Sequence, residues 1–401
     1  MPSRPDLRPP GLSPSPPQGM SFVLRGAGAA SCGHMLPLPA SLFPEFPAED
    51  QRHHHDALML AVQRVLQSGR FVLGEEGKAF EAEFAAHLGG GAVTGVASGT
   101  DAIELLLRAL EIGPDDAVVL PALAPSAVAA AVRRASARIV LCDVQEETLT
   151  LCPVALRECL QGASGIKAVL AVHLYGHPCD WKALEEVCDA HGVFLIEDAA
   201  QAHGAMWNQK NVGTLGKASV WSFYPTKNLG ALGDAGSIWT SEAALTEKLR
   251  CLREYGWRKR HISEQAGINS RLDEIQAAML RVKLPQLTRH NERRRELAAQ
   301  YAAALRHVRL PVVREGCVHA FHQYVIRSEH RDALQAYLKR HGVPAAVHYP
   351  AALHQQPAFA SGETFPVAEK AVHEVLSLPM HPYLSDAAIE AVCRVMEGFE
   401  A

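Results

Sequence analysis

SFYPTKNLGALGDAG, residues 222–236, contains one lysine, Lys227, shortly after a segment typical of a strand. Residues 219–224 (SVWSFY) predict that strand, and Pro225 ends it because proline lacks the N–H that a ladder requires. Upstream, VFLIED at residues 193–198 is apolar and β-branched and predicts a buried strand that ends in Asp198. Open α/β sheets bind ligands at the carboxyl ends of their strands. We therefore expect Lys227 and Asp198 to leave neighbouring strand ends.

A third segment, VASGTDAIELLLRAL at residues 96–110, predicts the start of a helix. Ser98, Gly99 and Thr100 form a small-residue turn before an apolar helical pattern, and the free N–H groups of a helix N-terminus suit an anion. Taken singly, each feature has an ordinary explanation as a helix cap, a surface lysine or a turn-forming aspartate. Together they supply an amine for an aldehyde, a carboxylate for a ring nitrogen and a phosphate cradle. The combination predicts a pyridoxal phosphate site.

The order of the elements predicts an α/β fold. From about residue 69, apolar strand patterns alternate with helical ones, which indicates right-handed crossovers and a mainly parallel sheet sandwiched by helices. Residues 287–308 predict a long helix with a partly buried stripe formed by Leu287, Leu297, Tyr301 and Leu305. We expect this helix to lead from a large domain, 41–285, into a smaller C-terminal α/β domain, 286–401.

Residues 1–40 are rich in Pro, Ser and Gly, and we expect a flexible N-terminal extension rather than a domain. They lack the compact apolar stretch and cleavage pattern of a signal peptide. Met20 and Met35 lie within this stretch, and the sequence leaves open whether the chain starts at one of them.

Composition excludes several classes of function. The chain has 401 residues, 48% of them hydrophobic, which is enough for two cores. Its net charge of −4 gives no case for nucleic acid or an anionic membrane as a partner, and no apolar run approaches the ~20 residues of a spanning helix. The nine cysteines have no metal-like spacing and are expected to be reduced thiols in a cytoplasm. His53, His54 and His55 are adjacent and do not share a helix face, so a solvated run is favoured over a metal site.

From about residue 69 to the C-terminus the chain resembles the DegT/DnrJ-type nucleotide-sugar aminotransferases, which have the pyridoxal-phosphate-dependent fold type I. The resemblance rests on ordered motifs: GRFVLGEEGKAFEAEFAAHLG, VASGTDAIELLL, VHLYGHPCD, IEDAAQAHGA, SFYPTKNLGALGDAG, NSRLDEIQAAML, VHYP and LSLPMHP. It implies a large mainly parallel sheet domain and a smaller C-terminal domain.

The resemblance implies roles for individual residues. Lys227 would bond to the cofactor and move protons, Asp198 would pair with the ring nitrogen, and Gln201 would contact the ring hydroxyl. The phosphate would be held by Gly99, Thr100 and Ser222. Asn269 would reach the phosphate of a partner subunit, which implies a homodimer with shared active sites.

One position departs from the family pattern. Where the family presents an aromatic residue to stack on the cofactor ring, the segment PALAPSAVAAAV, residues 121–132, places Pro125. A proline lacks the area and quadrupole of an aromatic ring. This departure keeps open a catalytically weak paralogue that binds the cofactor and acts as a regulatory or scaffold component.

Transamination is the reaction that the resemblance favours. Relatives that dehydrate sugars carry histidine in place of the lysine, whereas this chain has Lys227. Glutamate is the expected amino donor, leaving pyridoxamine phosphate that then aminates a nucleotide-linked keto sugar. Tyr224 after the Ser-Phe pair favours the group that aminates C3 of dTDP-3-keto-6-deoxyhexoses, in deoxyamino sugar biosynthesis. A keto-cyclitol substrate is a further alternative.

Several residues are candidates for contact with the sugar or its diphosphate because their side chains can bond hydroxyls and phosphates. Each has the alternative of a packed or capping role. They are Tyr175, His322, Tyr324, His348 and Tyr349.

A basic cluster could receive the nucleotide diphosphate or could simply be solvated. Its members are Arg253, Arg258, Lys259, Arg260 and His261.

Overall fold

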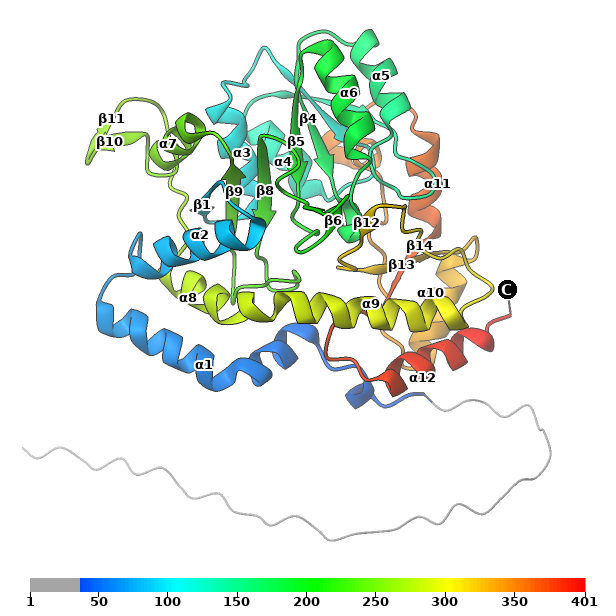
Figure 1. Ribbon diagram of the computed structural model, residues 1–401. Coiled ribbons are helices and arrows are strands. Elements are labelled where there is room, and N and C mark those ends of the chain that lie inside the picture. The colour runs from blue at the N-terminus through cyan, green and yellow to red at the C-terminus, as the bar shows by residue number, and fades with distance from the viewer. Residues whose placement is uncertain (1–36, 401) are drawn as a thin grey trace, which may run out of the picture. The chain divides into compact units, whose positions relative to one another are not determined.

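The structure, a computed structural model, describes residues 37–400 (Figure 1). All but the last four residues of the predicted N-terminal extension lie outside the described residues, as do Met20 and Met35. Within the described part, strands and helices alternate as expected for an α/β fold.

The main sheet has seven strands in the order β1-β9-β8-β5-β4-β2-β3. The five strands from β8 to β3 are parallel, whereas β9 runs antiparallel to both β1 and β8. The predicted strands at 193–198 and 219–224 are β5 and β8. The strands are β1 (Ala92–Val96), β2 (Ala117–Pro121), β3 (Arg138–Cys142), β4 (Ile166–Val172), β5 (Phe194–Asp198), β8 (Ala218–Ser222) and β9 (Gly236–Thr240).

Helices cover both faces of this sheet because its central strands are apolar on both sides. In β4, Leu170 and Val172 pack into one cluster with α3 (Gly99–Ala109), α4 (Ser126–Arg134), α7 (Ala243–Leu252) and α11 (Pro366–Glu374). The intervening Val169 and Ala171 pack with α5 (Pro153–Gly162) and α6 (Trp181–His191) on the other face. A strand buried on both faces is typical of parallel sheets.

Aromatic side chains from distant parts of the chain pack against the end of β8. Phe80 and Phe84 of α2 (Glu75–Leu88) place their rings edge-on against Phe223 and Trp221, with centroid separations of 5.1–5.3 Å. Residues of α8 (Glu274–Lys283) complete the same cluster. This packing holds the end of β8, from which the lysine segment leaves.

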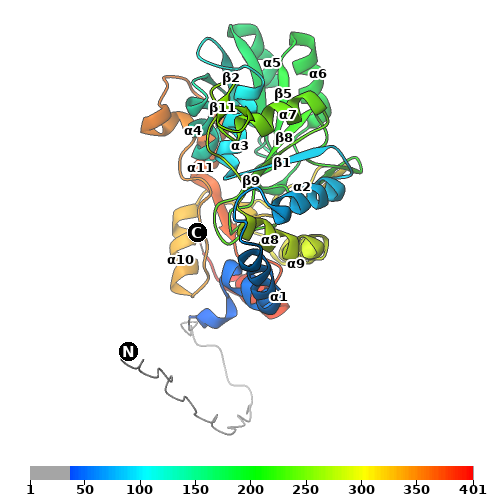
Figure 2. The ribbon, with the colours of Figure 1, turned by 90° about the vertical axis from the view of Figure 1, so that its left-hand side faces the viewer.

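The predicted long helix is α9 (Leu287–Ala304). Its stripe is divided between two clusters: Leu287 packs under the main sheet, whereas Leu297, Tyr301 and Leu305 pack among the C-terminal elements. Those elements are α10 (Arg331–Arg340), α12 (Asp386–Glu397) and the antiparallel pair β13 (Tyr324–Arg327) and β14 (Val375–Leu378). Figures 1 and 2 show α8 and α9 between the sheet and α1 (Phe46–Ser68).

Besides the β13–β14 pair, two small sheets lie outside the main one. One is the hairpin β10 (Trp257–Lys259) and β11 (Ile262–Ser263). The other joins β6 (Met206–Trp207), β7 (Lys210–Asn211) and β12 (Cys317–Val318).

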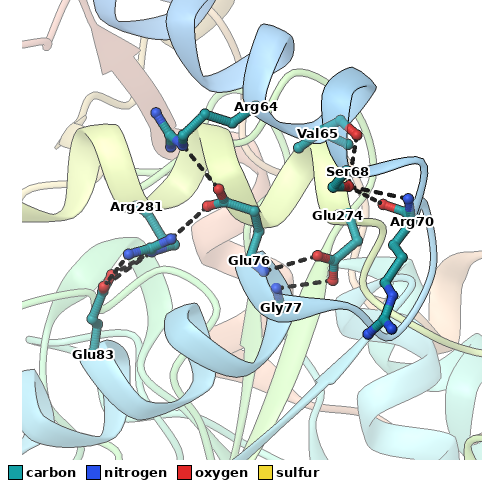
Figure 3. Close-up of polar contacts among 9 residues, drawn as sticks. All are labelled: Arg64, Val65, Ser68, Arg70, Glu76, Gly77, Glu83, Glu274 and Arg281. Atoms are coloured by element: carbon teal, nitrogen blue, oxygen red, sulfur yellow. Dashed lines mark hydrogen bonds and ion pairs between the residues drawn. The ribbon is translucent and has the colours of Figure 1, made fainter.

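A buried glutamate joins α8 to α2 (Figure 3). Oε1 of Glu274 accepts from the N–H groups of Gly74 and Gly77 at 2.8 and 2.9 Å, and Oε2 accepts from Glu76 N–H at 2.8 Å. The carboxylate therefore caps the free N–H groups of a helix that begins about 200 residues earlier in the chain. Arg281 of α8 adds ion pairs to Glu76 at 2.6 Å and Glu83 at 2.7 Å.

Among residues 37–400, no helix is long and apolar enough to cross a membrane. The same residues contain no cluster of His, Cys, Asp and Glu that could hold a metal ion.

Candidate active site

A cavity of about 240 Å³ lies where β5 and β8 end and α3 begins. It brings together six of the seven residues expected at the cofactor, namely Gly99, Thr100, Asp198, Gln201, Ser222 and Lys227. Pro125 lines the same cavity. Segments that are far apart in the sequence thus meet in one cavity.

Asp198 is the last residue of β5, where parallel pairing with β8 places it beside Val220. Its side chain is buried, and Oδ1 accepts from the N–H of Ala200 at 3.0 Å. Burial raises the pKa of Asp198, while that hydrogen bond and the charge of Lys227 oppose the rise. A cation placed against this carboxylate would therefore be strongly favoured.

Lys227 is held by a compact turn. Its N–H donates to the Tyr224 carbonyl at 2.8 Å, and Phe223 and Ala231 close the base of the turn with a hydrogen bond of 2.8 Å. Lys283 of α8 donates to the Gly230 carbonyl at 2.9 Å from outside. Burial lowers the pKa of the Lys227 amine to about 8, and Asp198 opposes that change. An appreciable fraction of the amine is neutral near physiological pH, as a nucleophile requires.

The expected anion cradle is present. Ser98 is the N-cap of α3, and its Oγ accepts from Asp101 N–H at 3.1 Å. A Cβ at position 99 would lie 2.8 Å from the Cβ of Ser222, so only glycine lets the helix N-terminus approach the end of β8 this closely. The helix start and the Ser222 hydroxyl therefore line one wall of the cavity.

Gln201 is fixed from two sides. Its Oε1 accepts from the backbone N–H of Tyr175 at 2.6 Å, and its Nε2 donates to the Tyr349 hydroxyl at 3.0 Å. Tyr175 in turn donates its hydroxyl to the His348 carbonyl. Tyr175 and Tyr349, two of the five residues considered as sugar contacts, thus bond to Gln201, and a third, His348, bonds to Tyr175; none of the three lines the cavity.

The other two candidates occupy different places. Tyr324 is buried in the C-terminal cluster, with its ring 4.8 Å from that of Tyr301. His322 is buried next to the lysine segment, where its Nδ1 lies 3.2 Å from Oδ1 of Asn228. That oxygen can only accept, so Nδ1 of His322 donates.

Asn269, the seventh residue expected at the cofactor, does not line the cavity. It is exposed and forms an isolated bridge with Glu254. The neighbouring Ser270 is anchored, because its hydroxyl donates to Asp101 at 2.7 Å and accepts from Ala97 N–H at 3.0 Å.

The basic cluster of the sequence is divided by the fold. Arg253 is buried, pairs with Glu81 at 2.5 Å and donates to the Gly95 carbonyl at 2.8 Å, so its role here is structural. The other four members are exposed on or beside the β10–β11 hairpin.

The sequence motifs did not single out every residue of the cavity. Ala127 and Val128 of α4 and Asp234 also line it. Asp234 lies inside the quoted motif around Lys227, which was the available signal. Asn228 was also missed: its side chain links His322 to Asn291 of α9 at 2.8 Å, a contact between residues far apart in the chain.

The residues present fit pyridoxal phosphate. A buried carboxylate, an enclosed amine of lowered pKa and the N-terminus of an 11-residue helix meet in one cavity. They match the ring nitrogen, the aldehyde and the phosphate respectively.

Comparison with known proteins agrees with this geometry. The model of the DegT/DnrJ/EryC1/StrS aminotransferase family matches residues 53–397. A Streptomyces venezuelae protein named dTDP-3-amino-3,4,6-trideoxy-alpha-D-glucose transaminase is 43% identical over 361 residues, which cover 88% of this chain and 94% of the relative. A Geobacillus stearothermophilus protein named pleiotropic regulatory protein is also 43% identical, over 352 residues, covering 85% and 94%.

Among solved structures, that of DesV from S. venezuelae matches with a TM-score of 0.85 and 39% identity, covering 89% of this chain and all of that one. The predicted fold type I architecture is confirmed. The chain belongs to the DegT/DnrJ/EryC1/StrS aminotransferase family.

Proposed function

We propose that this aminotransferase, whose cofactor is pyridoxal phosphate, transfers an amino group to a nucleotide-linked keto-deoxysugar. The finer substrate proposal is a dTDP-3-keto-6-deoxyhexose with glutamate as donor. The observation that carries the reaction class is the enclosure of Lys227 and Asp198 in one cavity beside the N-terminus of α3. The name of the S. venezuelae relative supports the substrate class.

Different residues of the cavity would have different roles in the reaction. Asp198 would hold a positive charge on the ring nitrogen, and the start of α3 with Ser222 would hold the phosphate. When bound, pyridoxal phosphate supplies an electron sink for amino transfer. Lys227 Nζ would bond to the cofactor at rest and, once released by the amino donor, would carry a proton between substrate carbon and cofactor as general base and acid.

The test of the reaction class is the visible spectrum of the purified protein with pyridoxal phosphate. We expect an absorption band that bleaches when glutamate is added, and borohydride reduction followed by peptide mapping should place the label on Lys227. Lys227→Ala should lose the band and the activity while keeping its fold, whereas Lys210→Ala, an exposed lysine, serves as the matched control. A label on another lysine would contradict the proposed role of Lys227.

The substrate is tested separately, by supplying dTDP-linked and UDP-linked 3-keto sugars and a keto-inositol to the protein in its aminated form. We expect turnover with the dTDP-linked 3-keto-6-deoxyhexose. Preference for the UDP-linked sugar or the cyclitol would redirect the substrate proposal and leave the reaction class intact.

A regulatory role is the second candidate, since Pro125 replaces the expected aromatic residue and one relative is named a pleiotropic regulatory protein. The two candidates differ in one result. A protein that binds pyridoxal phosphate but shows no bleaching with any amino donor would favour regulation over catalysis.

We also propose a homodimer with shared active sites, in which Asn269 serves the partner's phosphate. Its exposure and the anchoring of Ser270 beside it support this role. The eight cysteines among the described residues are free thiols, which supports a reducing compartment such as the cytoplasm.

A further inference from the structure

Tyr175 adopts a backbone conformation that is unfavourable for a large side chain. Its φ of 59° and ψ of 1° lie in the left-handed region. Such strain persists only where the surroundings impose it, and it concentrates at functional sites. Here the following residue, Gly176, packs so closely that a Cβ would lie 2.9 Å from the Gln201 carbonyl oxygen and 3.1 Å from the N of His322. In this turn the Tyr175 N–H lies 2.6 Å from Oε1 of Gln201.

This contact determines which way the Gln201 amide faces. A backbone N–H can only donate, so the side-chain atom 2.6 Å from Tyr175 N must be the oxygen Oε1. Nε2 then lies on the opposite side of the amide. It carries two hydrogens, of which one is donated to the Tyr349 hydroxyl at 3.0 Å. The second hydrogen is left for a ligand in the cavity that Gln201 lines.

Tyr349 bonds to the nitrogen of the Gln201 amide, and Tyr175 bonds to its oxygen. Its hydroxyl oxygen accepts from Gln201, and burial raises its pKa to about 12, so the group stays protonated and neutral. The segment that carries it is fastened in place. The Tyr175 hydroxyl donates to the His348 carbonyl, and His348 Nδ1 lies 2.9 Å from Ser377 Oγ on β14.

We propose that Tyr349 is a positioning residue: with the backbone N–H of Tyr175 it clamps the Gln201 amide so that an Nε2 hydrogen faces the ring oxygen of the cofactor. The inference rests on the proposed function, because the ring oxygen is the group that Gln201 is expected to contact. In this arrangement Tyr349, from the C-terminal part of the chain, acts on the cofactor through Gln201, which follows β5 of the main sheet.

The clamp has a measurable consequence at Lys227. A hydrogen bond from Gln201 withdraws negative charge from the ring oxygen, and a less negative oxygen attracts the proton on the nearby Lys227 nitrogen less strongly. Loss of the hydrogen bonds that orient Gln201 should therefore raise the pKa of the Lys227 nitrogen in the cofactor-loaded protein. The pH midpoint of the bound cofactor's visible absorption reports this directly, without turnover.

The experiment is a double-mutant cycle on the cofactor-loaded protein. Tyr349→Phe should raise the absorption midpoint by about 0.5–1 pH unit, as expected for one neutral hydrogen bond. In the Gln201→Ala background the same substitution should produce no further shift, because the residue through which it acts is gone. Tyr337→Phe on α10 removes a hydroxyl remote from the cavity and should leave the midpoint unchanged.

Each other result overturns the inference. Equal shifts in both backgrounds would show that Tyr349 acts on the cofactor directly, and an unchanged midpoint in Tyr349→Phe would show that it positions nothing. Far-ultraviolet circular dichroism and the thermal midpoint establish that each variant is folded. Absence of any visible band in the parent protein would overturn the proposed function as well, so the two failures are distinguishable.

Discussion

At the scale of single residues, position in the sequence identifies chemical groups, and burial sets their reactivity. Asp198 ends one predicted strand and Lys227 follows another, and both line the same cavity. The lowered pKa of Lys227 and the raised pKa of Asp198 come mainly from desolvation, which depends on residues distant in the chain. The sequence therefore does not distinguish a lysine or aspartate with a shifted pKa from one with an ordinary pKa.

The first prediction concerns the amine of Lys227. The rate at which cofactor-free protein takes up pyridoxal phosphate should rise about tenfold per pH unit and level off near pH 8, because the neutral amine is the reactive form. Stopped-flow absorbance measures this rate. Asp198→Asn removes the charge that favours the protonated amine, so it should lower the midpoint. A rate that keeps rising to pH 10 would contradict the lowered pKa.

At the scale of elements, helix termini do much of the positioning. The N-terminus of α3 is capped within its own segment by Ser98, and the NSRLDEIQAAML motif supplies Ser270 to hold Asp101 in its first turn. The next residues of that motif supply Glu274, which caps α2 from another part of the chain. One motif therefore orders the starts of two helices, and a sequence pattern reveals only the local cap.

The second prediction follows from the cap on α2 (Figure 3). Glu274→Ala leaves three N–H groups without their acceptor and should lower the free energy of unfolding by about 3 kcal/mol. Urea denaturation measures this loss. Glu75→Ala, which removes an exposed ion pair with Lys78, is the matched control and should change stability by less than about 0.5 kcal/mol. Similar midpoints for the two variants would rule out the capping role.

At the scale of the whole molecule, burial of titratable groups couples stability to pH. Desolvation lowers the pKa of His177 and His381 to about 4 and that of His203 to about 3. These histidines stay neutral in the folded protein, whereas in the unfolded chain they bind protons below their ordinary pKa of 6.5.

The third prediction is the resulting stability profile. The contribution of these groups is fully present above pH 6.5 and is lost as pH falls from 6.5 toward 4, because only the unfolded chain gains protons there. Thermal midpoints of the cofactor-free protein at closely spaced pH values should fall steeply in that window. His381→Gln should flatten the slope, and His55→Gln, at an exposed position, should not. A flat profile would mean that the histidines are protonated in the folded state.

The fourth prediction tests the proposed sharing of sites between subunits. Lys227→Ala and Asn269→Ala should each be impaired alone, but a co-expressed mixture should regain activity. Only a mixed dimer contains a site with an intact lysine from one subunit and an intact asparagine from the other. Random pairing gives about a quarter of the parent activity, and a purified mixed dimer, in which one of the two sites is intact, gives about half. Differently tagged variants purified as mixed dimers provide the measurement, and no recovery would indicate that Asn269 does not serve the partner's site.

The sequence by itself determined the alternation of strands and helices, the positions of Asp198 and Lys227 at neighbouring strand ends, and the capped start of α3. These features depend on periodicity, proline and capping residues, whose effects are local and are therefore visible in the order of the residues.

Only the tertiary structure decided how the side chains around the site are used. It separated the buried Arg253 from an exposed basic cluster, placed Tyr324 in a core, and brought Tyr175 and Tyr349 to the two sides of Gln201. Tyr349 meets Gln201 across 148 positions of the chain. Contacts of this kind depend on how layers pack over one another, and no local pattern of residues encodes that packing.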